Sequence, residues 1–249
     1  KLSFLRKKFY IYPAQNSKLK LADEKVVCKD CHKKSGCEYY DNNDLEKIKN
    51  FTIEFTTCKF DRALKILESV SNKDNKTFWY NKGLALRQKT LEIASKKIKQ
   101  VTQMADVKDK EIIGLYREST KCFEKAILVD THYTKAWYWR GRNLLDLKQF
   151  KESINCFENV IKLDHHNEQN RKLGALLFIG VNYLNLRNSH KAAEYLLPLF
   201  DSINHDLIKI DTFEEFLEYI LIPSNFETLL EHLVQTPIAE ISTGSGLRH

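Results

Sequence analysis

One eighteen-residue stretch of this chain occurs twice, thirty-four residues apart. YRESTKCFEKAILVDTHY at 116–133 returns as FKESINCFENVIKLDHHN at 150–167, with eight positions identical. Repetition at this spacing is typical of arrays in which each unit is a pair of helices that buries its apolar face by stacking on its neighbours. Such arrays build extended surfaces, so the repeat favours a function in binding over one in catalysis.

The residues between the two copies complete the repeating unit. Lys135–Leu144 predicts one helix, because Trp137, Gly141 and Leu144 fall at spacings of four and three. Phe150–Leu163 predicts a second amphipathic helix after a short polar break. Its inward positions are predicted to be Phe150, Ile154, Phe157 and Ile161, with the smaller Ser153, Cys156 and Val160 beside them. The unit is therefore a helix–turn–helix.

This unit resembles the tetratricopeptide repeat. The positions of that family's motif hold Trp137, Arg140, Gly141 and Leu144 in the first helix, then Ser153 and Phe157 in the second. The sequence departs from the motif where Arg140 replaces the usual Leu, Ser153 the usual Ala and His165 the usual Pro. The long stem of Arg140 lets its charge reach solvent, so we expect the helix to be retained.

Weaker copies flank the central unit. Trp79–Leu86 resembles a first helix, and Lys89–Ile113 is predicted to extend it and its partner into a long hairpin. Leu176–Tyr183 with His190–Leu196 resembles a later unit, and Phe60–Leu67 the second helix of a degenerate leading unit. The resemblance implies an all-α fold, a right-handed superhelical array of helix–turn–helix repeats with a small N-terminal cysteine-containing module.

Four segments are expected along the chain. They are a basic N-terminal segment with a cysteine cluster at 1–44, the repeats at 45–200 with the extended hairpin at 89–113, capping helices at 201–240, and a flexible tail at 241–249. No run approaches the length of apolar sequence that spans a bilayer, so no membrane insertion is expected. Charges interrupt the apolar residues at the N-terminus, which argues against a secretory signal and favours a cytoplasmic protein.

The net charge of +7 comes from the N-terminal segment. Residues 1–34 contain ten Lys or Arg and three Asp or Glu, so the remaining residues are neutral overall. A basic arm of this kind neutralises phosphates on nucleic acid or an acidic surface. The alternative interpretation is a solvated leader without a binding role.

Four cysteines predict a metal site. Cys28 and Cys31 form a C-x2-C pair, and Cys37 and Cys58 complete a set of four thiolates for one structural zinc ion. The alternatives are free thiols with Cys58 in a repeat core, or disulfides or an iron–sulfur cluster. Cys122 and Cys156 occupy equivalent repeat positions and are predicted to be small core residues.

The resemblance implies that the first helices of the repeats line a concave groove that receives a peptide or a partner helix. The residues predicted to face this groove are Tyr80, Asn81, Arg87, Lys135, Tyr138, Trp139 and Arg142. The alternative for Trp139 is burial under the next repeat. Basic and aromatic side chains together favour an acidic or aromatic-containing protein segment as the partner.

The sequence therefore predicts a non-catalytic scaffold or adaptor that binds a protein segment. The alternative is an RNA- or DNA-associated adaptor that uses the basic N-terminal cysteine module. An enzyme is the least favoured class, because the sequence contains no phosphate-binding glycine loop, no HExxH and no nucleophile elbow.

Overall fold

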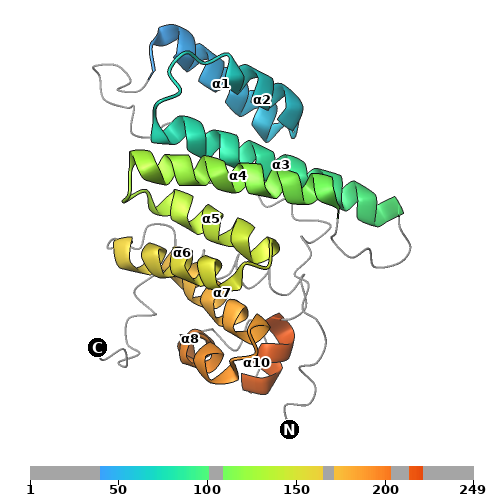
Figure 1. Cartoon of the computed structure of the whole chain (residues 1–249), viewed down its shortest axis with the longest axis vertical. Coiled ribbons are helices and arrows are strands. Elements are labelled where there is room, and N and C mark those ends of the chain that lie inside the picture. Colours follow the sequence, from blue (N-terminus) through green and yellow to red (C-terminus); the bar gives the residue numbers. More distant parts are fainter. Residues whose placement is uncertain (1–39, 101–108, 165–170, 203–212, 221–249) are drawn as a thin grey trace. The chain divides into compact units, whose positions relative to one another are not determined.

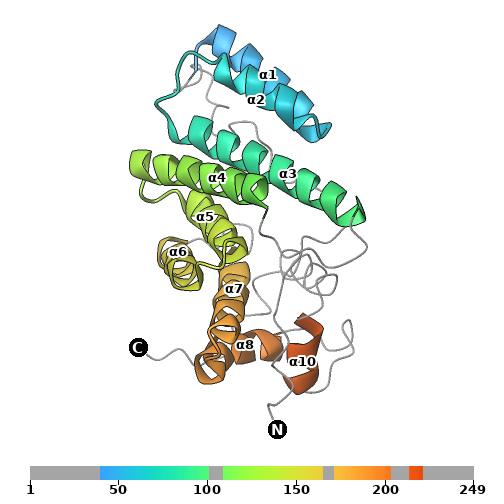
Figure 2. The same cartoon turned by 45° about the vertical axis from the view of Figure 1, so that its right-hand side comes forward.

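The computed structural model of the protein describes residues 40–100, 109–164, 171–202 and 213–220. Within these ranges every regular element is an α-helix, as Figure 1 shows from one side and Figure 2 from another. The predicted all-α class is confirmed for this part of the chain. The superhelical handedness of the array and the N-terminal cysteine module remain predictions.

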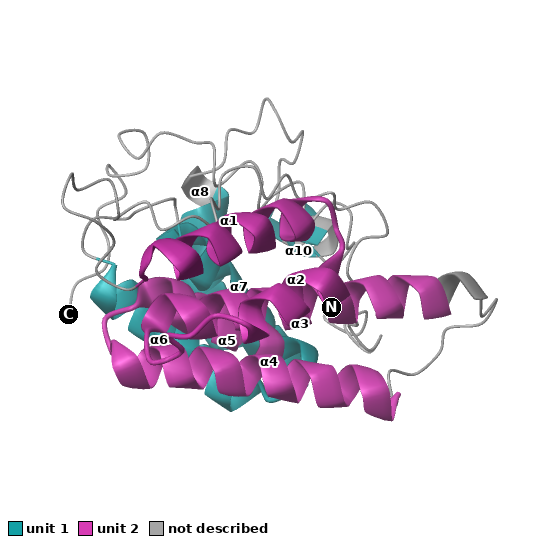
Figure 3. Cartoon of the chain, turned by 90° about the horizontal axis from the view of Figure 1, so that it is seen from above, with its two compact units in different colours: residues 1–14, 144–249 teal, residues 15–143 magenta. Residues whose placement is uncertain are grey.

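The chain divides into two compact units (Figure 3). Unit 2 comprises residues 15–143, and unit 1 comprises residues 1–14 and 144–249. Unit 2 contains α1 (Asn42–Thr56), α2 (Phe60–Glu68), α3 (Lys76–Gln100), α4 (Lys110–Val129) and most of α5 (Thr134–Asp146). Unit 1 contains α6 (Phe150–Leu163), α7 (Arg171–Asn185), α8 (Ser189–Ser202) and α10 (Phe213–Ile220).

In unit 2 each helix packs on the next, α1 on α2, α2 on α3 and α3 on α4. The core between them contains fully buried aromatic side chains, among them Phe51, Phe55, Phe78 and Phe123. In unit 1, α6 packs on α7, α7 on α8 and α8 on α10. Phe157 of α6 stacks on Phe178 of α7 with the ring centroids 5.0 Å apart. Sequential helix packing is what the repeat pattern predicts for each unit.

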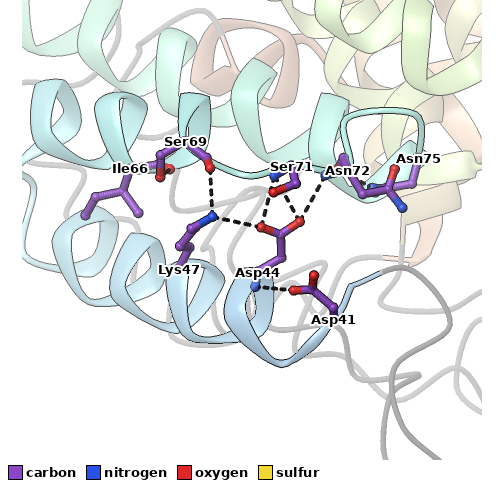
Figure 4. A network of polar contacts seen from close by, with 8 residues as sticks. All are labelled: Asp41, Asp44, Lys47, Ile66, Ser69, Ser71, Asn72 and Asn75. Atoms are coloured by element: carbon purple, nitrogen blue, oxygen red, sulfur yellow. Dashed lines mark hydrogen bonds and ion pairs between the residues drawn. The ribbon is translucent and has the colours of Figure 1, made fainter.

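A polar network fixes the start of α1 against the segment that joins α2 to α3 (Figure 4). The buried carboxylate of Asp44 accepts hydrogen bonds of 2.9 Å from the backbone N–H groups of Ser71 and Asn72. The ammonium of Lys47 lies 3.1 Å from the same carboxylate and donates to the carbonyl of Ser69 over 2.9 Å. A buried carboxylate is stable only with such partners, so the network ties α1 to a specific place on its neighbours.

The two long helices of unit 2 lie side by side, and α3 is the longer (Figure 2). Helix α3 continues to Gln100 and α4 begins at Lys110, so both helices enter the segment 89–113; residues 101–108 lie outside the described residues. The ends of the two helices are joined by Lys97, whose ammonium lies 2.6 Å from Asp109 and 2.8 Å from Glu111. Asp109 also caps α4 by accepting from two backbone N–H groups of its first turn.

The turns that join the paired helices share one backbone conformation. Cys58, Lys148 and Arg187 each have a φ near +60°, and each stands two residues before a second helix. The backbone N–H of the next residue donates to the carbonyl of the residue five positions earlier. These hydrogen bonds run from Lys59 to Glu54 (2.8 Å), from Gln149 to Leu144 (2.8 Å) and from Asn188 to Tyr183 (2.9 Å). This is the Schellman ending of a helix. The turn between α1 and α2 therefore has the same backbone conformation as the turns before α6 and α8.

Two glycines allow the helices of a pair to approach closely. A Cβ placed on Gly83 would lie 2.7 Å from the ring of Phe123, and one on Gly180 would overlap the side chain of Leu196. In each case the second helix of the pair places a large side chain against bare backbone. This contact compensates for the cost of glycine inside a helix, about 1 kcal/mol against alanine.

The C-terminal part of the predicted array is described only over α10. Phe200 at the end of α8 contacts Phe213 and Phe216, with ring centroids 5.9 and 5.5 Å apart. Helix α10 falls within the segment 201–240 for which capping helices are predicted. The remainder of that segment beyond residue 220 and the tail predicted at 241–249 lie outside the described residues.

Candidate functional site

Three of the predicted groove residues share one side of α5. Lys135, Tyr138 and Arg142 stand at spacings of three and four and are all partly exposed. The first turn of this helix is anchored by Trp137, whose indole N–H donates to the carbonyl of Thr131 over 2.9 Å. The α5 face, defined as these three residues, is therefore accessible to a partner.

Four of the seven predicted residues are buried instead: Tyr80 at 5%, Asn81 at 1%, Arg87 at 3% and Trp139 at 6% exposure. The expectation that they face outward is wrong, because neighbouring helices cover them. The ring of Tyr80 packs against Tyr133 at 5.3 Å and against Phe123 at 6.0 Å. Trp139 is also buried, but the core cluster that contains it is formed by residues that precede it in the chain, not by the next repeat.

The ring of Trp139 is in contact with two guanidinium groups. The carbon at the centre of the Arg142 guanidinium lies 5.1 Å from the Trp139 ring centroid, and that of Arg87 lies 5.5 Å from it. The ring of Tyr138 meets that of Trp139 edge-on at 5.8 Å. Cation–π contacts of this kind orient an arginine without neutralising it. Trp139 thus packs against the side chains of Arg142 and Tyr138, both of which are partly exposed.

A buried hydrogen-bond chain holds α3, α4 and α5 together under this face. Arg87 donates from Nη1 to the amide oxygen of Asn143 over 2.6 Å. Asn143 donates from Nδ2 to the hydroxyl of Ser119 over 2.8 Å, and that hydroxyl donates to the carbonyl of Gly83 over 2.7 Å. The hydrogen bonds between these buried side chains tie the three helices to one another. The α5 face is therefore presented on a fixed frame.

The sequence did not reveal this network, although one signal was present. Ser119 and Ser153 recur thirty-four residues apart at a position where the family motif has Ala. In the structure each serine accepts from an asparagine of a following helix: Asn143 donates to Ser119, and Asn182 donates to Ser153 over 3.0 Å. The departure from the motif therefore has a structural role.

Arg140, the other unusual residue, is also explained. Its guanidinium lies 2.8 Å from the carboxylate of Glu124 on α4 and above the ring of Trp137. The side chain is partly exposed, as expected from its long stem. An ion pair between α5 and α4 therefore replaces the apolar contact of the usual Leu.

The predicted zinc ligands fall mostly outside the described residues. Cys28, Cys31 and Cys37 precede residue 40, whereas Cys58 is exposed in the turn between α1 and α2. The alternative that places Cys58 in a repeat core is therefore wrong. No group of three or more His, Cys, Asp or Glu side chains within the described ranges is arranged to hold a metal. The structural zinc site remains a prediction.

The two repeat cysteines lie in the core, as predicted. Cys122 is 4% exposed and Cys156 is fully buried. Burial raises the pKa of the Cys122 thiol to about 12. This thiol is therefore neutral at physiological pH and unsuited to nucleophilic or metal chemistry.

Comparison with known proteins supports the repeat. The family model described as the tetratricopeptide repeat matches residues 134–167, which cover α5 and α6. This match confirms the resemblance on which the fold prediction rests. No curated protein sequence matches the chain significantly. In the part of the chain that the structure describes, no helix combines the length and the apolar character needed to cross a bilayer.

Proposed function

Because the chain carries a tetratricopeptide repeat, we propose that it is a non-catalytic adaptor that binds an acidic segment of a partner protein on the α5 face. The observation that carries this proposal is the presentation of Lys135, Tyr138 and Arg142 together on one side of α5, above a rigid buried network. A repeat of this family favours a protein partner.

The charge of α5 favours an acidic segment. Helix α5 contains the cations Lys135, Arg140 and Arg142 and one acid, Asp146, in its last turn. Arg140 pairs with Glu124, and the buried Arg87 adds a further cation beneath the face. Complementary charge steers association and excludes wrong partners.

The residue types of the face are those that dominate binding energies. Tyr, Trp and Arg are enriched where substitution costs most affinity, because they combine large contact areas with hydrogen bonding. Here Tyr138 and Arg142 are already oriented by Trp139. Little side-chain entropy is therefore lost when a partner binds.

One buried donor also supports a ligand at this place. The indole N–H of Trp139 has no hydrogen-bond acceptor within the described residues. A buried donor without a partner costs about 1–3 kcal/mol. Because this nitrogen is closed to solvent, a carbonyl or carboxylate of a bound segment would supply the missing acceptor only after the side chains that cover it move aside.

The test is a nuclease-treated pull-down that compares the intact chain with Lys135→Glu/Arg142→Glu. The matched control is Lys151→Glu/Lys162→Glu, which reverses two exposed lysines of α6. The proposal predicts a protein that is retained by the intact chain and the control and lost from the double variant. Equal retention by all three baits, or a loss of helical content in the double variant, would contradict it.

A second candidate function is association with RNA or DNA through the N-terminal segment. It rests on the ten Lys or Arg against three acidic residues at 1–34. Binding to phosphates predicts an affinity for single-stranded RNA that falls steeply with salt and is lost when residues 1–40 are removed. Retention of RNA by the truncated chain would contradict this candidate.

A further inference from the structure

Helix α4 carries a line of cations on its outer side. Six exposed residues follow one another along it at spacings of three or four: Lys110, Gly114, Arg117, Lys121, Lys125 and Leu128. These six residues are called the α4 ridge. They lie on one face of the helix, opposite the buried residues Ile112, Tyr116, Ser119, Phe123 and Ala126. The ridge contains four cations and no acid.

The ridge cations differ from the described lysines of α1 and α3 in having no carboxylate partner. Among the described residues, Lys110, Arg117 and Lys121 form no ion pair, whereas most lysines of α1 and α3 do. Helix α4 also carries three acids, Glu111, Glu118 and Glu124, and Glu124 pairs with Arg140 of α5. Glu111 pairs with Lys97 of α3, and Glu118 interacts electrostatically with Lys82. The ridge itself contains no acid, and the printed ion pairs of the acids of α4 are made with Lys97 and Arg140, which lie on other helices.

Gly114 interrupts the ridge without a packing reason. A Cβ added there would meet no atom within 4 Å, in contrast to the glycines at positions 83 and 180. An exposed glycine inside a helix costs about 1 kcal/mol against alanine. Because Gly114 has no side chain, the surface between Lys110 and Arg117 is open, and the backbone of another segment can approach α4 closely there.

The ridge ends in exposed apolar side chains. Leu128 is 81% exposed and Val129 is 51% exposed, the former being the most exposed large apolar residue in the described part of unit 2. Nucleic acid offers little apolar surface to such residues, whereas an amphipathic helix does. This apolar end favours a protein partner.

The one aromatic residue beside the ridge is not available to stack on a base. The ammonium of Lys125 lies 4.0 Å from the centroid of the Trp79 ring, and that of Lys82 lies 5.8 Å from it. Recognition of single strands depends on open aromatic faces in addition to cations. The occupied ring of Trp79 thus argues for a protein over RNA at this surface.

We propose that the α4 ridge is a second docking surface, separate from the α5 face, and that it binds an acidic amphipathic helix of a partner protein. Arg117, Lys121 and Lys125 are spaced by four residues, which places them about 6 Å apart along the helix axis. A partner helix with carboxylates at the same spacing matches all three. The partner's apolar end then covers Leu128, and its backbone passes Gly114.

The experiment measures binding of two labelled synthetic peptides to the full chain by fluorescence anisotropy. One peptide is a helix with Glu at every fourth position and Leu at one end of the same face; the other has the same composition with the Glu residues distributed around the helix. The patterned peptide is expected to bind and the distributed one to bind at least about tenfold more weakly, because only the first matches the ridge. A single-stranded RNA of similar charge serves as the third probe.

Variants locate the binding. Arg117→Glu/Lys121→Glu is expected to weaken binding of the patterned peptide at least about tenfold. Gly114→Leu, whose side chain enters open space, weakens it by filling the gap while leaving the fold intact. Lys135→Glu/Arg142→Glu leaves it unchanged, so failure of this proposal is distinguishable from failure of the α5 proposal. The α6 control Lys151→Glu/Lys162→Glu also leaves it unchanged.

Three results would overturn the proposal. The first is equal binding of the two peptides or binding of neither. The second is unaltered binding by the ridge variant when its circular dichroism matches that of the intact chain. The third is stronger binding of RNA than of the patterned peptide, with loss of that RNA binding in the ridge variant, which would assign the ridge to nucleic acid.

Discussion

The amide of Asn143 donates to the hydroxyl of Ser119 over 2.8 Å, and this bond joins α5 to α4 in the core of unit 2. Unit 1 repeats the relationship with Asn182 and Ser153. The two bonds differ in their surroundings. Asn182 also donates to the carbonyl of Phe178 over 2.7 Å, whereas no second acceptor for the Asn143 amide is found in the described part of the chain.

Removing the two serine hydroxyls therefore has unequal effects. Ser119→Ala leaves the buried amide of Asn143 without its acceptor and is expected to lower the free energy of unfolding by about 1–3 kcal/mol. Ser153→Ala is expected to cost less, because Asn182 retains its bond to Phe178. Urea unfolding followed by circular dichroism measures both. Equal costs, or a gain from Ser119→Ala, would contradict the network.

Glycine at the shared turns is expected to stabilise the protein. Lys148 and Arg187 adopt a left-handed backbone conformation that costs a non-glycine residue about 1–2 kcal/mol. Lys148→Gly and Arg187→Gly should each raise the free energy of unfolding by up to about 1 kcal/mol, since glycine also loses more entropy on folding. As a control, Lys151→Gly inside α6 should lower it. A loss at all three positions would show that the turns are not left-handed in solution.

Replacing Gly83 or Gly114 by alanine is expected to change the stability of the protein in opposite directions. Gly83→Ala forces a Cβ against the ring of Phe123 and should destabilise the protein by about 1–3 kcal/mol. Gly114→Ala enters open space and should stabilise it by about 1 kcal/mol through helix propensity alone. Thermal unfolding of the two variants tests the contrast. Stabilisation by both would mean that α3 and α4 are not in close contact at Gly83.

The lowered pKa of the Asp44 carboxyl should make the stability of the protein depend on pH. Burial by itself raises the pKa of this carboxyl, but the N–H groups of Ser71 and Asn72 and the ammonium of Lys47 outweigh it and hold the pKa below the ordinary 3.8. A pKa that is lower in the folded state stabilises the protein above the unfolded-state value, and this contribution is lost as the pH falls through the folded-state pKa.

The variant Asp44→Asn isolates that contribution. At neutral pH it should lower the free energy of unfolding by about 1–3 kcal/mol, because the amide lacks the charge that its partners stabilise. The difference from the intact chain should shrink as the pH falls below 3.8. Urea titrations at pH 7 and at decreasing acid pH measure it. A difference that stays constant with pH would exclude the network as its source.

The regular helices were predictable wherever the apolar pattern and the repeat motif coincide. Helix α6 has the predicted bounds Phe150–Leu163, and α5 extends the predicted Lys135–Leu144 by three residues in total, one before it and two after it. Helix α1 was not identified, since it has neither Trp nor Gly at the motif positions. The spacing of Ile48, Phe51 and Phe55, all buried, was the signal available for it.

The site was less predictable than the fold. Periodicity assigns a face to a residue only relative to its own helix, and it does not show which neighbouring helix covers that face. Arg87 was predicted to face outward from its position in the helical period, yet it is buried against Trp139 and Tyr116 and donates to Asn143. A buried cation of this kind depends on partners from other helices, and the sequence does not identify them.

The central claim is that a partner protein binds on the α5 face. It is tested most directly by hydrogen–deuterium exchange of the full chain with and without the protein retained in the pull-down. The account predicts slower exchange in residues 134–143 in the complex, and no such change for Lys135→Glu/Arg142→Glu mixed with the same partner. Protection confined to residues 1–39, with α5 exchanging as in the free chain, would contradict it.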